Sequence, residues 1–193
     1  GIRVFATGGI GGVHRGAETS FDVSADIGEL SRSQVAVVTA GAKAILDLKL
    51  TLEMLESCCV PVVGFRTDEF PAFYSRASGL RVPMRVETAA EVAAMIVAQR
   101  RLGLMTGMVI ANPIPDADEI PTVEIEPVIA AARAAAAARD ITGKDVTPFL
   151  LARLAEATAG RSLDANIALV ENNARVATEI AVELARISQL TRS

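Results

Sequence analysis

The sequence predicts an α/β protein with an α/β/α layered fold, in which a largely parallel or mixed central sheet precedes a helical C-terminal part. Two observations predict this class. Short apolar, β-branched runs alternate with helical patterns through residues 1–111, as in a sheet whose parallel strands are connected by helices. After "ANPIPDADEIP" no further segment resembles a strand. The chain has 193 residues, of which 51% are hydrophobic, so it is large enough to bury an ordinary core.

The first part is expected to contain five strands and three helices. The expected strands are Ile2–Ala6, Val35–Val38, Val60–Phe65, Arg81–Val86 and Leu104–Ile110. The expected helices are Asp26–Arg32, Ala44–Ser57 and Thr88–Leu102. Thr88 and Glu91, three residues apart, form a capping box at the start of the third helix. Because ligands of parallel sheets gather where the strands end, these ends are the places to search for a site.

The second part, residues 112–193, is expected to be helical. "VIAAARAAAAARD" consists almost wholly of helix formers, and alanine favours helix more than any other residue. Thr147 before Pro148 marks a further helix start, and Ser162 begins a pattern that runs towards Leu190. We therefore predict one domain over residues 1–193. We expect this domain to be N-terminally incomplete, because an apolar, β-branched run that is typical of a strand begins directly at the start of the sequence.

Charge and cysteine content narrow the class of partner. The net charge is −4, with acids and bases interspersed, which predicts against nucleic acid as a partner. No apolar run reaches the roughly 20 residues that span a bilayer. Cys58 and Cys59 are adjacent, which is poor geometry for bridging each other. These features favour a cytoplasmic protein that acts on a small molecule.

The acidic segment "DVSAD" is a candidate ligand site. In an extended chain, Asp22, Ser24 and Asp26 share one face, while the residues between them turn to the core. A face of oxygens suits Mg²⁺ or Mn²⁺, and it equally suits sugar hydroxyls. The alternative is that Asp26, with Glu29 three residues later, only caps a helix.

The segment "GGIGGVHRG" precedes the acids and holds the only histidine of the chain. Glycine lets the backbone approach a bound molecule closely, but the spacing fits neither the dinucleotide fingerprint nor the P-loop. His14 either binds an anion or caps a turn. It has no second His or Cys at metal spacing, which argues against zinc.

Lys43, in "VAVVTAGAKAILD", follows an expected buried strand and starts an expected helix. The positive potential of a helix N-terminus disfavours an ammonium group, and a neutral amine can form an imine with a sugar aldehyde. The alternative is a solvated lysine near a helix start. Two weaker candidates remain. The aromatic loop "TDEFPAFYSRASG" is expected to form a lid or wall for a flat ring, or else a packing or subunit contact. At least one of Asn166, Asn172 and Asn173 is expected to meet a partner or ligand, because buried amides are costly when unpaired.

Five blocks of sequence, taken in their order and spacing, resemble the pseudouridine-5′-phosphate glycosidase family. The blocks are "FATGGIGGVHRGAETSFDVSADIGEL", "VVTAGAKAILD", "VVGFRTDEFPAFYSRASGL", "ANPIP" and "GKDVTPFLLARLAEATAGRSLDANIALVENNA". Together they cover nearly the whole chain. The resemblance implies an enzyme that reversibly splits pseudouridine 5′-phosphate, with water, into uracil and ribose 5-phosphate. It also implies a trimer and a Mn²⁺ cofactor, with Mg²⁺ as the alternative.

The resemblance assigns roles residue by residue. Lys43 matches the covalent nucleophile and Asp22 the manganese ligand. The segment in contact with substrate is matched by Ser24, Ala25 and Asp26, and further substrate contacts are matched by Thr7, His14 and Asn166. The family's upstream glutamate, thought to be the proton donor, and an upstream substrate lysine have no counterpart here, so we expect weak binding and poor turnover from this chain alone.

Two other functions remain open. One is a different imine-forming phosphosugar lyase or aldolase, and the other is an inactive sugar-phosphate-binding module. The bond to be broken favours the first assignment. It joins C1′ to a ring carbon of uracil, which a pair of carboxylates alone is insufficient to cleave, whereas an amine that attacks C1′ supplies an electron sink.

Overall fold

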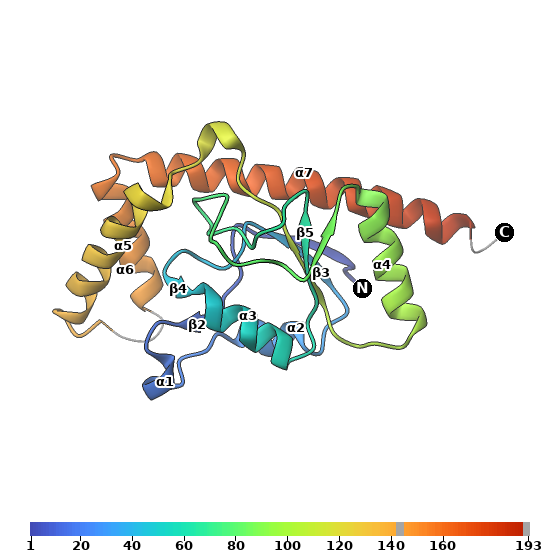
Figure 1. The fold of residues 1–193 in the computed structure, drawn as a ribbon, viewed down its shortest axis with the longest axis horizontal. Helices are drawn as coiled ribbons and strands as arrows, with labels where there is room; N and C mark the ends of the chain where they lie inside the picture. Colours follow the sequence, from blue (N-terminus) through green and yellow to red (C-terminus); the bar gives the residue numbers. More distant parts are fainter. Residues whose placement is uncertain (142–144, 191–193) are drawn as a thin grey trace.

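The computed structural model describes residues 1–141 and 145–190, and it places a five-stranded sheet between layers of helices (Figure 1). All four strand pairings in this sheet are parallel. The strands, in spatial order, are β1 (Val4–Ala6), β3 (Ala36–Thr39), β7 (Met108–Ala111), β5 (Val62–Phe65) and β6 (Met84–Val86). Each lies within one residue of an expected run, and the α/β/α class is confirmed.

One face of the sheet is covered by α4 (Ala89–Arg101) and the C-terminal half of α7 (Arg161–Leu190). Alternate strand residues point to this face, as the period of two requires, and Val38, Val63 and Ile110 are buried there. Thr88 caps α4 through the predicted capping box. In Figure 1, α7 runs along the whole upper edge of the molecule and links both ends of the fold.

The opposite face is covered by α2 (Ala25–Leu30) and α3 (Leu48–Ser57), which pack on the other set of alternating strand residues. The helices α5 (Thr122–Ala137) and α6 (Val146–Ala157) join the same core and pack against the N-terminal half of α7. The prediction of a helical second part is confirmed. The last block of the family resemblance begins with Gly143 and Lys144, which lie outside the described residues.

Several short elements were not predicted. These are β2 (Val13–His14), which pairs antiparallel with β4 (Leu46–Asp47), the helix α1 (Ala17–Ser20) and the 3₁₀ turn η1 (Asp116–Asp118). Two-residue strands show no periodicity that a sequence pattern can reveal. The expected helix Ala44–Ser57 was therefore wrong at its start. Asp47 caps α3 by accepting a hydrogen bond from the Leu50 N–H at 2.9 Å, and the residues before it are extended or irregular.

No helix in the described ranges has both the length and the hydropathy to cross a membrane.

Candidate functional site

A small cavity lies at the carboxyl ends of β1 and β3, where α7 passes over the sheet. Its volume is about 230 Å³, and Thr7, Lys43 and Asn166 all line it. Thr7 follows the last residue of β1, Lys43 comes four residues after the end of β3, and Asn166 lies on α7. Three residues named from the sequence are therefore brought together where a parallel sheet places its ligands.

Lys43 is half-buried and is held through its backbone rather than its side chain. Its N–H donates to the Ile10 carbonyl at 3.0 Å, and its own carbonyl accepts the Leu46 N–H at 2.9 Å. Among the described residues, its side-chain nitrogen has no hydrogen bond or ion pair. A correction follows from the fold: α3 begins only at Leu48, so Lys43 does not stand at a helix N-terminus and the helix-dipole argument does not apply.

The aromatic loop forms one wall of the cavity. Phe73 and Tyr74 line it, with ring centroids 4.7 Å apart and planes at 86°, an edge-to-face arrangement that aromatic pairs favour. Both rings and Phe70 are buried, so wall and packing interpretations are both correct. Burial raises the pKa of Tyr74 to about 12, against a smaller opposing effect of a hydrogen bond with Ser162. The phenol therefore stays protonated beside the lysine at neutral pH.

The glycine segment serves two purposes. Gly8 and Gly9 line the cavity, and a Cβ on Gly9 would lie 2.6 Å from the Phe73 ring and 3.1 Å from the Lys43 nitrogen of the backbone. Gly11 and Gly12 are needed for a different reason, because Ser24 and Thr51 fill the space where their Cβ atoms would stand. Only the first pair fits the prediction of a backbone that approaches a bound molecule.

The acidic segment is hydrogen-bonded to the backbone of the glycine segment. The Asp26 carboxylate accepts the Gly11 N–H at 2.7 Å. Ser24, and not Asp26, is the N-cap of α2, and its hydroxyl accepts the Asp26 N–H at 3.2 Å. Because the helix starts directly after Ser24, the period of two breaks there. Val23 and Ala25 are consequently exposed, and the prediction that they turn to the core was wrong.

Asp22 and His14 form a second polar group outside the cavity. His14 Nδ1 lies 3.9 Å from Asp22 Oδ2, and the His14 N–H donates to the Asp22 carbonyl at 3.0 Å. Nowhere in the described part of the chain do three or more His, Cys, Asp or Glu side chains gather as metal ligands would. Of the described residues in this group, Asp22 alone offers carboxylate oxygens to a hard cation, so the cation expected at Asp22 from the sequence stays a prediction. The neighbouring Arg15 is paired with Glu126 at 2.5 Å.

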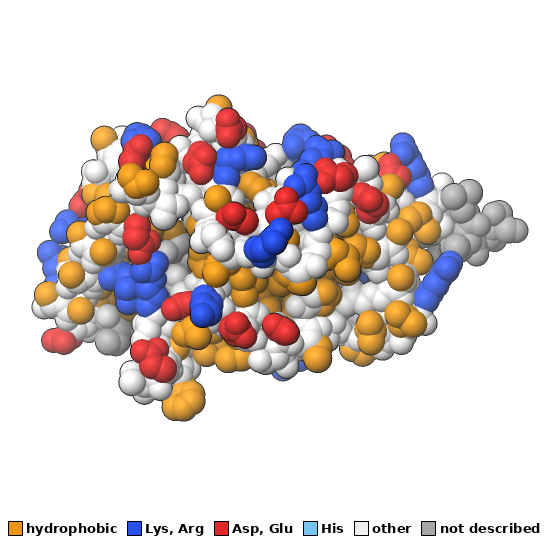
Figure 2. All heavy atoms as spheres, viewed as in Figure 1, with side chains coloured by type: hydrophobic (Ala, Val, Ile, Leu, Met, Phe, Trp, Pro, Cys, Tyr) orange, Lys and Arg blue, Asp and Glu red, His pale blue; other side chains and the backbone are white. Residues whose placement is uncertain are grey.

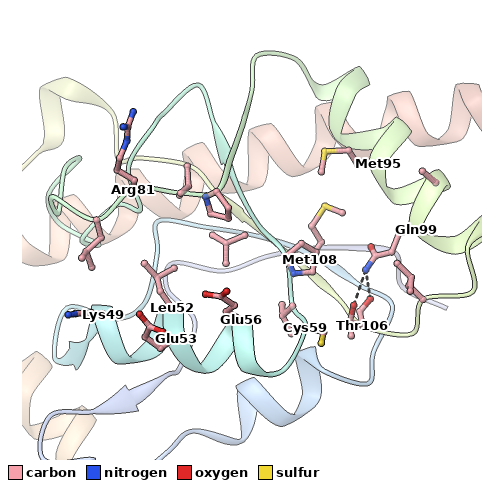
Figure 3. Close-up of a pocket in the computed structure, with 18 of the residues that line it drawn as sticks. Lys49, Leu52, Glu53, Glu56, Cys59, Arg81, Met95, Gln99, Thr106 and Met108 are labelled. Carbon is pink, nitrogen blue, oxygen red and sulfur yellow. Dashed lines mark hydrogen bonds between the residues drawn. The ribbon is translucent and has the colours of Figure 1, made fainter.

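A second and larger hollow lies elsewhere. It is a groove of about 940 Å³ between α3 and α4, near the amino ends of β5 and β7. Figure 2 shows hydrophobic side chains gathered over this part of the surface. In Figure 3, Leu52 and Glu56 project from α3, while Met95 and Gln99 project from α4. The Gln99 Nε2 donates a hydrogen bond to the Thr106 carbonyl at 2.9 Å.

Sequence reasoning missed three residues around the small cavity. Thr147 lines it and had been noted only as a helix start. Asn112 and Thr39 lie behind it at the carboxyl ends of β7 and β3, where both make buried hydrogen bonds. For Thr39 and Asn112 the available signal was a polar residue at the end of a buried strand of a parallel sheet, or directly after it. Thr147 lies on α6 and carries no such signal.

The fold and the cavity define a class, that of α/β proteins with a ligand site at the carboxyl edge of a parallel sheet and a lysine inside it. The chain belongs to the family described as indigoidine synthase A like protein, whose model matches residues 1–183. The confirmed family membership agrees with the resemblance stated from the sequence, since curated relatives in this family are named pseudouridine-5′-phosphate glycosidase.

The relatives extend well beyond the chain. A pseudouridine-5′-phosphate glycosidase from Methylobacterium nodulans is 61% identical over 184 residues, which are 95% of this chain and 55% of that protein. Its counterpart from Paracoccus denitrificans is 60% identical over 96% of this chain and 61% of its own length. The chain thus spans somewhat more than half the length of these relatives.

Two crystal structures share the fold. An indigoidine synthase A-like protein from Thermotoga maritima superposes with a TM-score of 0.86 at 46% identity, over 95% of this chain and 60% of that one. The prealnumycin C-glycosynthase AlnA, solved in complex with ribulose 5-phosphate, gives a TM-score of 0.91 at 36% identity, over 97% and 62%.

Proposed function

We propose that this chain forms the lysine-bearing part of a glycosidase that reversibly cleaves pseudouridine 5′-phosphate into uracil and ribose 5-phosphate through an imine on Lys43. The observation that carries the proposal is the Lys43 amine, which forms no hydrogen bond or ion pair with the residues that the structure describes and lies in a small cavity with Thr7 and Asn166. The names of the curated relatives support the reaction, and the sugar phosphate bound by AlnA supports the class of substrate.

In the proposed reaction, the sugar becomes bound to Lys43 before the bond to uracil breaks. The Lys43 amine attacks C1′, the bond from C1′ to the ring oxygen breaks, and that oxygen takes a proton. The ring carbon of uracil is then protonated and the bond from C1′ to this carbon breaks. Its electron pair passes to the uracil ring as the lysine nitrogen forms a double bond to C1′. Water hydrolyses the imine, which releases ribose 5-phosphate and restores the amine.

The remaining residues have binding roles in this proposal. Thr7 and Asn166 line the cavity and offer a hydroxyl and an amide to the substrate. The family resemblance adds His14 and the segment from Ser24 to Asp26 as substrate contacts. Asp22 would hold Mn²⁺, with Mg²⁺ as the alternative, and the cation when bound would supply positive charge to substrate oxygens. A homotrimer is proposed on the same resemblance, and light scattering measures it.

Borohydride trapping tests the lysine. The chain has three lysines, Lys43, Lys49 and Lys144, so reduction in the presence of ribose 5-phosphate should label one peptide, the one that contains Lys43. Lys43→Arg should abolish the label. Lys49→Arg, at an exposed position on α3, is the matched control and should keep it. A label on other peptides, or none on the wild type, contradicts the proposal.

The products test the reaction. Release of uracil from pseudouridine 5′-phosphate, followed by chromatography, identifies a glycosidase. Cleavage within the sugar would instead identify a lyase or aldolase that uses the same lysine. Because the chain spans only part of its relatives, the trapping experiment is the primary test and turnover is the second.

A further inference from the structure

We infer that Asn173, oriented by Asn112, is a positioning residue that holds the Thr7–Gly8 backbone against the cavity and so sets the distance between this wall and Lys43. The inference deepens the proposed function and rests on it. It assigns a role to two asparagines that make no contact with the cavity themselves, since neither is among the residues that line it.

The hydrogen bonds of Asn173 define its orientation. The residue is fully buried on α7, and its Nδ2 donates to the Thr7 carbonyl at 2.8 Å and to the Gly8 carbonyl at 3.5 Å. Carbonyls only accept, so the amide nitrogen must face them. The Oδ1 atom therefore faces Asn112, whose Nδ2 donates to it at 2.8 Å. The hydrogen bond between the two side chains therefore sets the orientation of both amide groups.

The network joins the carboxyl ends of three strands to α7. Besides the bond from Asn173, the Gly8 carbonyl accepts the Ala40 N–H at 2.9 Å and lies 3.3 Å from the Thr39 hydroxyl. The same hydroxyl donates to the Gly41 carbonyl at 2.7 Å. Gly8 is thus held from β3 on one side and from α7 on the other, and a change on the α7 side leaves the first set of bonds in place.

The segment that Asn173 holds is the one that faces the lysine. Thr7 and Gly8 line the cavity with Lys43, and the next residue, Gly9, approaches the Lys43 backbone closely enough that a Cβ there would lie 3.1 Å from its nitrogen. A shift of this wall by a fraction of an ångström changes how a bound sugar meets the amine, and such misplacement is costly to rate.

Asn172 supplies a matched control on the same helix. Its Nδ2 donates to the Pro113 carbonyl at 3.1 Å, and its Oδ1 accepts from Arg175 at 2.8 Å. Like Asn173, it links α7 to a loop after β7, but its bonds do not reach the cavity wall. Loss of its amide nitrogen removes one hydrogen bond, against two for Asn173, and leaves the bonds to Thr7 and Gly8 in place.

The test compares Asn173→Asp with Asn172→Asp, since each keeps the side-chain shape and replaces the amide donor with a carboxyl group. At the buried Asn173 the change also introduces an ionisable group, so Asn112→Ala, which adds no charge, is measured beside it. Hydrogen exchange is measured first and needs no ligand. Asn173→Asp should speed exchange at least tenfold in residues 7–11, with no change in α4, whereas Asn172→Asp should not. Asn112→Ala removes the group that orients Asn173 and should also speed hydrogen exchange in residues 7–11. This variant replaces Asn173→Asp in the test if Asn173→Asp does not fold.

Trapping of ribose 5-phosphate on Lys43 is measured second, as a function of sugar concentration. Asn173→Asp should lower the maximal trapping rate about tenfold and change the half-saturating concentration less than threefold. Uniform acceleration of exchange across the chain, or wild-type exchange and trapping, would overturn the positioning role. If the wild type itself does not trap, the proposed function fails, while exchange in residues 7–11 still decides whether Asn173 holds this segment.

Discussion

Two hollows in the described part of the molecule differ in almost every respect. The cavity at Lys43 is about 230 Å³ and lies at the carboxyl ends of β1 and β3. The groove between α3 and α4 is about 940 Å³ and lies near the amino ends of β5 and β7. The residues next to the small cavity form a buried network of hydroxyl, amide and backbone hydrogen bonds. The large groove is lined mainly by apolar side chains (Figure 3).

Position in the sheet and a buried polar framework, rather than volume, favour the small cavity as the candidate site. In parallel sheets, loops at the carboxyl ends carry the ligand contacts, and buried amides that are fully paired hold such loops in one arrangement. The framework around Lys43 should therefore tolerate little change, and the groove should tolerate more. Substitutions in each region test this difference.

The largest effect is expected at Gly41, in the turn that leads from β3 to Lys43. Gly41 has φ of +94°, and a Cβ there would lie 2.0 Å from the Pro71 carbonyl oxygen. Gly41→Ala therefore meets backbone strain and a collision with a rigid group, and should lower the free energy of unfolding by about 3 kcal/mol or more. Urea denaturation followed by circular dichroism measures it.

Gly28→Ala is the control for Gly41→Ala. Gly28 lies inside α2, and a Cβ there would meet nothing within 4 Å. Because alanine favours helix over glycine, this change should raise the free energy of unfolding by up to about 1 kcal/mol. If both variants changed stability equally, the rigid packing of the turn after β3 would be refuted.

Alkaline pH probes the aromatic wall of the cavity. The pKa of Tyr74 is raised by burial to about 12, and its ordinary value is about 10. Below pH 10 the phenol is protonated in both states and contributes no pH dependence. Between pH 10 and 12 the unfolded chain loses the proton and the folded chain keeps it, so the free energy of unfolding falls as pH rises, by about 3 kcal/mol.

Tyr74→Phe isolates this effect, since Tyr74 is the only tyrosine of the chain. The unfolding free energy of the variant should fall less steeply between pH 10 and 12 than that of the wild type, and the difference in slope belongs to one phenol. Titration of the phenolate absorbance gives the pKa directly. A value near 10 in the folded protein would show that the wall is open to water.

Much of the fold was predictable because short apolar runs alternate with helical patterns along the first part of the chain. The five apolar runs located all five strands of the main sheet, and the capping box at Thr88 located the start of α4. The start of α3 was not predicted, because Leu46 and Asp47 pair with β2 and so are not part of the helix. That pairing brings together residues more than thirty positions apart, which no local pattern reveals.

The candidate site was predictable in part. Lys43 and Thr7 follow strands of a parallel sheet, so the general rule for such sheets places them at one edge. Asn166 was identified through the family resemblance, since nothing local separates it from Asn172 or Asn173. The pairing of Asn173 with Asn112 depends on how α7 crosses the sheet. The spacing of residues along the chain does not predict that crossing.

A moderate effect is expected at Asn166, which lines the cavity from α7. Among the described residues its side chain forms no hydrogen bond, so its amide is available to a ligand. Asn166→Ala should weaken binding of ribose 5-phosphate about five- to tenfold, the worth of one neutral hydrogen bond, and leave stability nearly unchanged. Calorimetry measures the affinity. Ile167→Ala, at a half-exposed position outside the cavity, should bind as the wild type does.

The smallest effect separates the two hollows directly. Leu104 is 50% exposed in the groove, and Leu151 is 37% exposed in the cavity. Each is replaced by serine, which removes a partly exposed aliphatic group and should cost about 1 kcal/mol of stability or less. Leu151→Ser should slow trapping of ribose 5-phosphate on Lys43 about two- to threefold, because it alters the wall against which the sugar lies. Leu104→Ser should trap at the wild-type rate. A slower rate in Leu104→Ser, without loss of folded protein, would mean that the groove and the cavity act as one site, and the contrast between them would no longer hold.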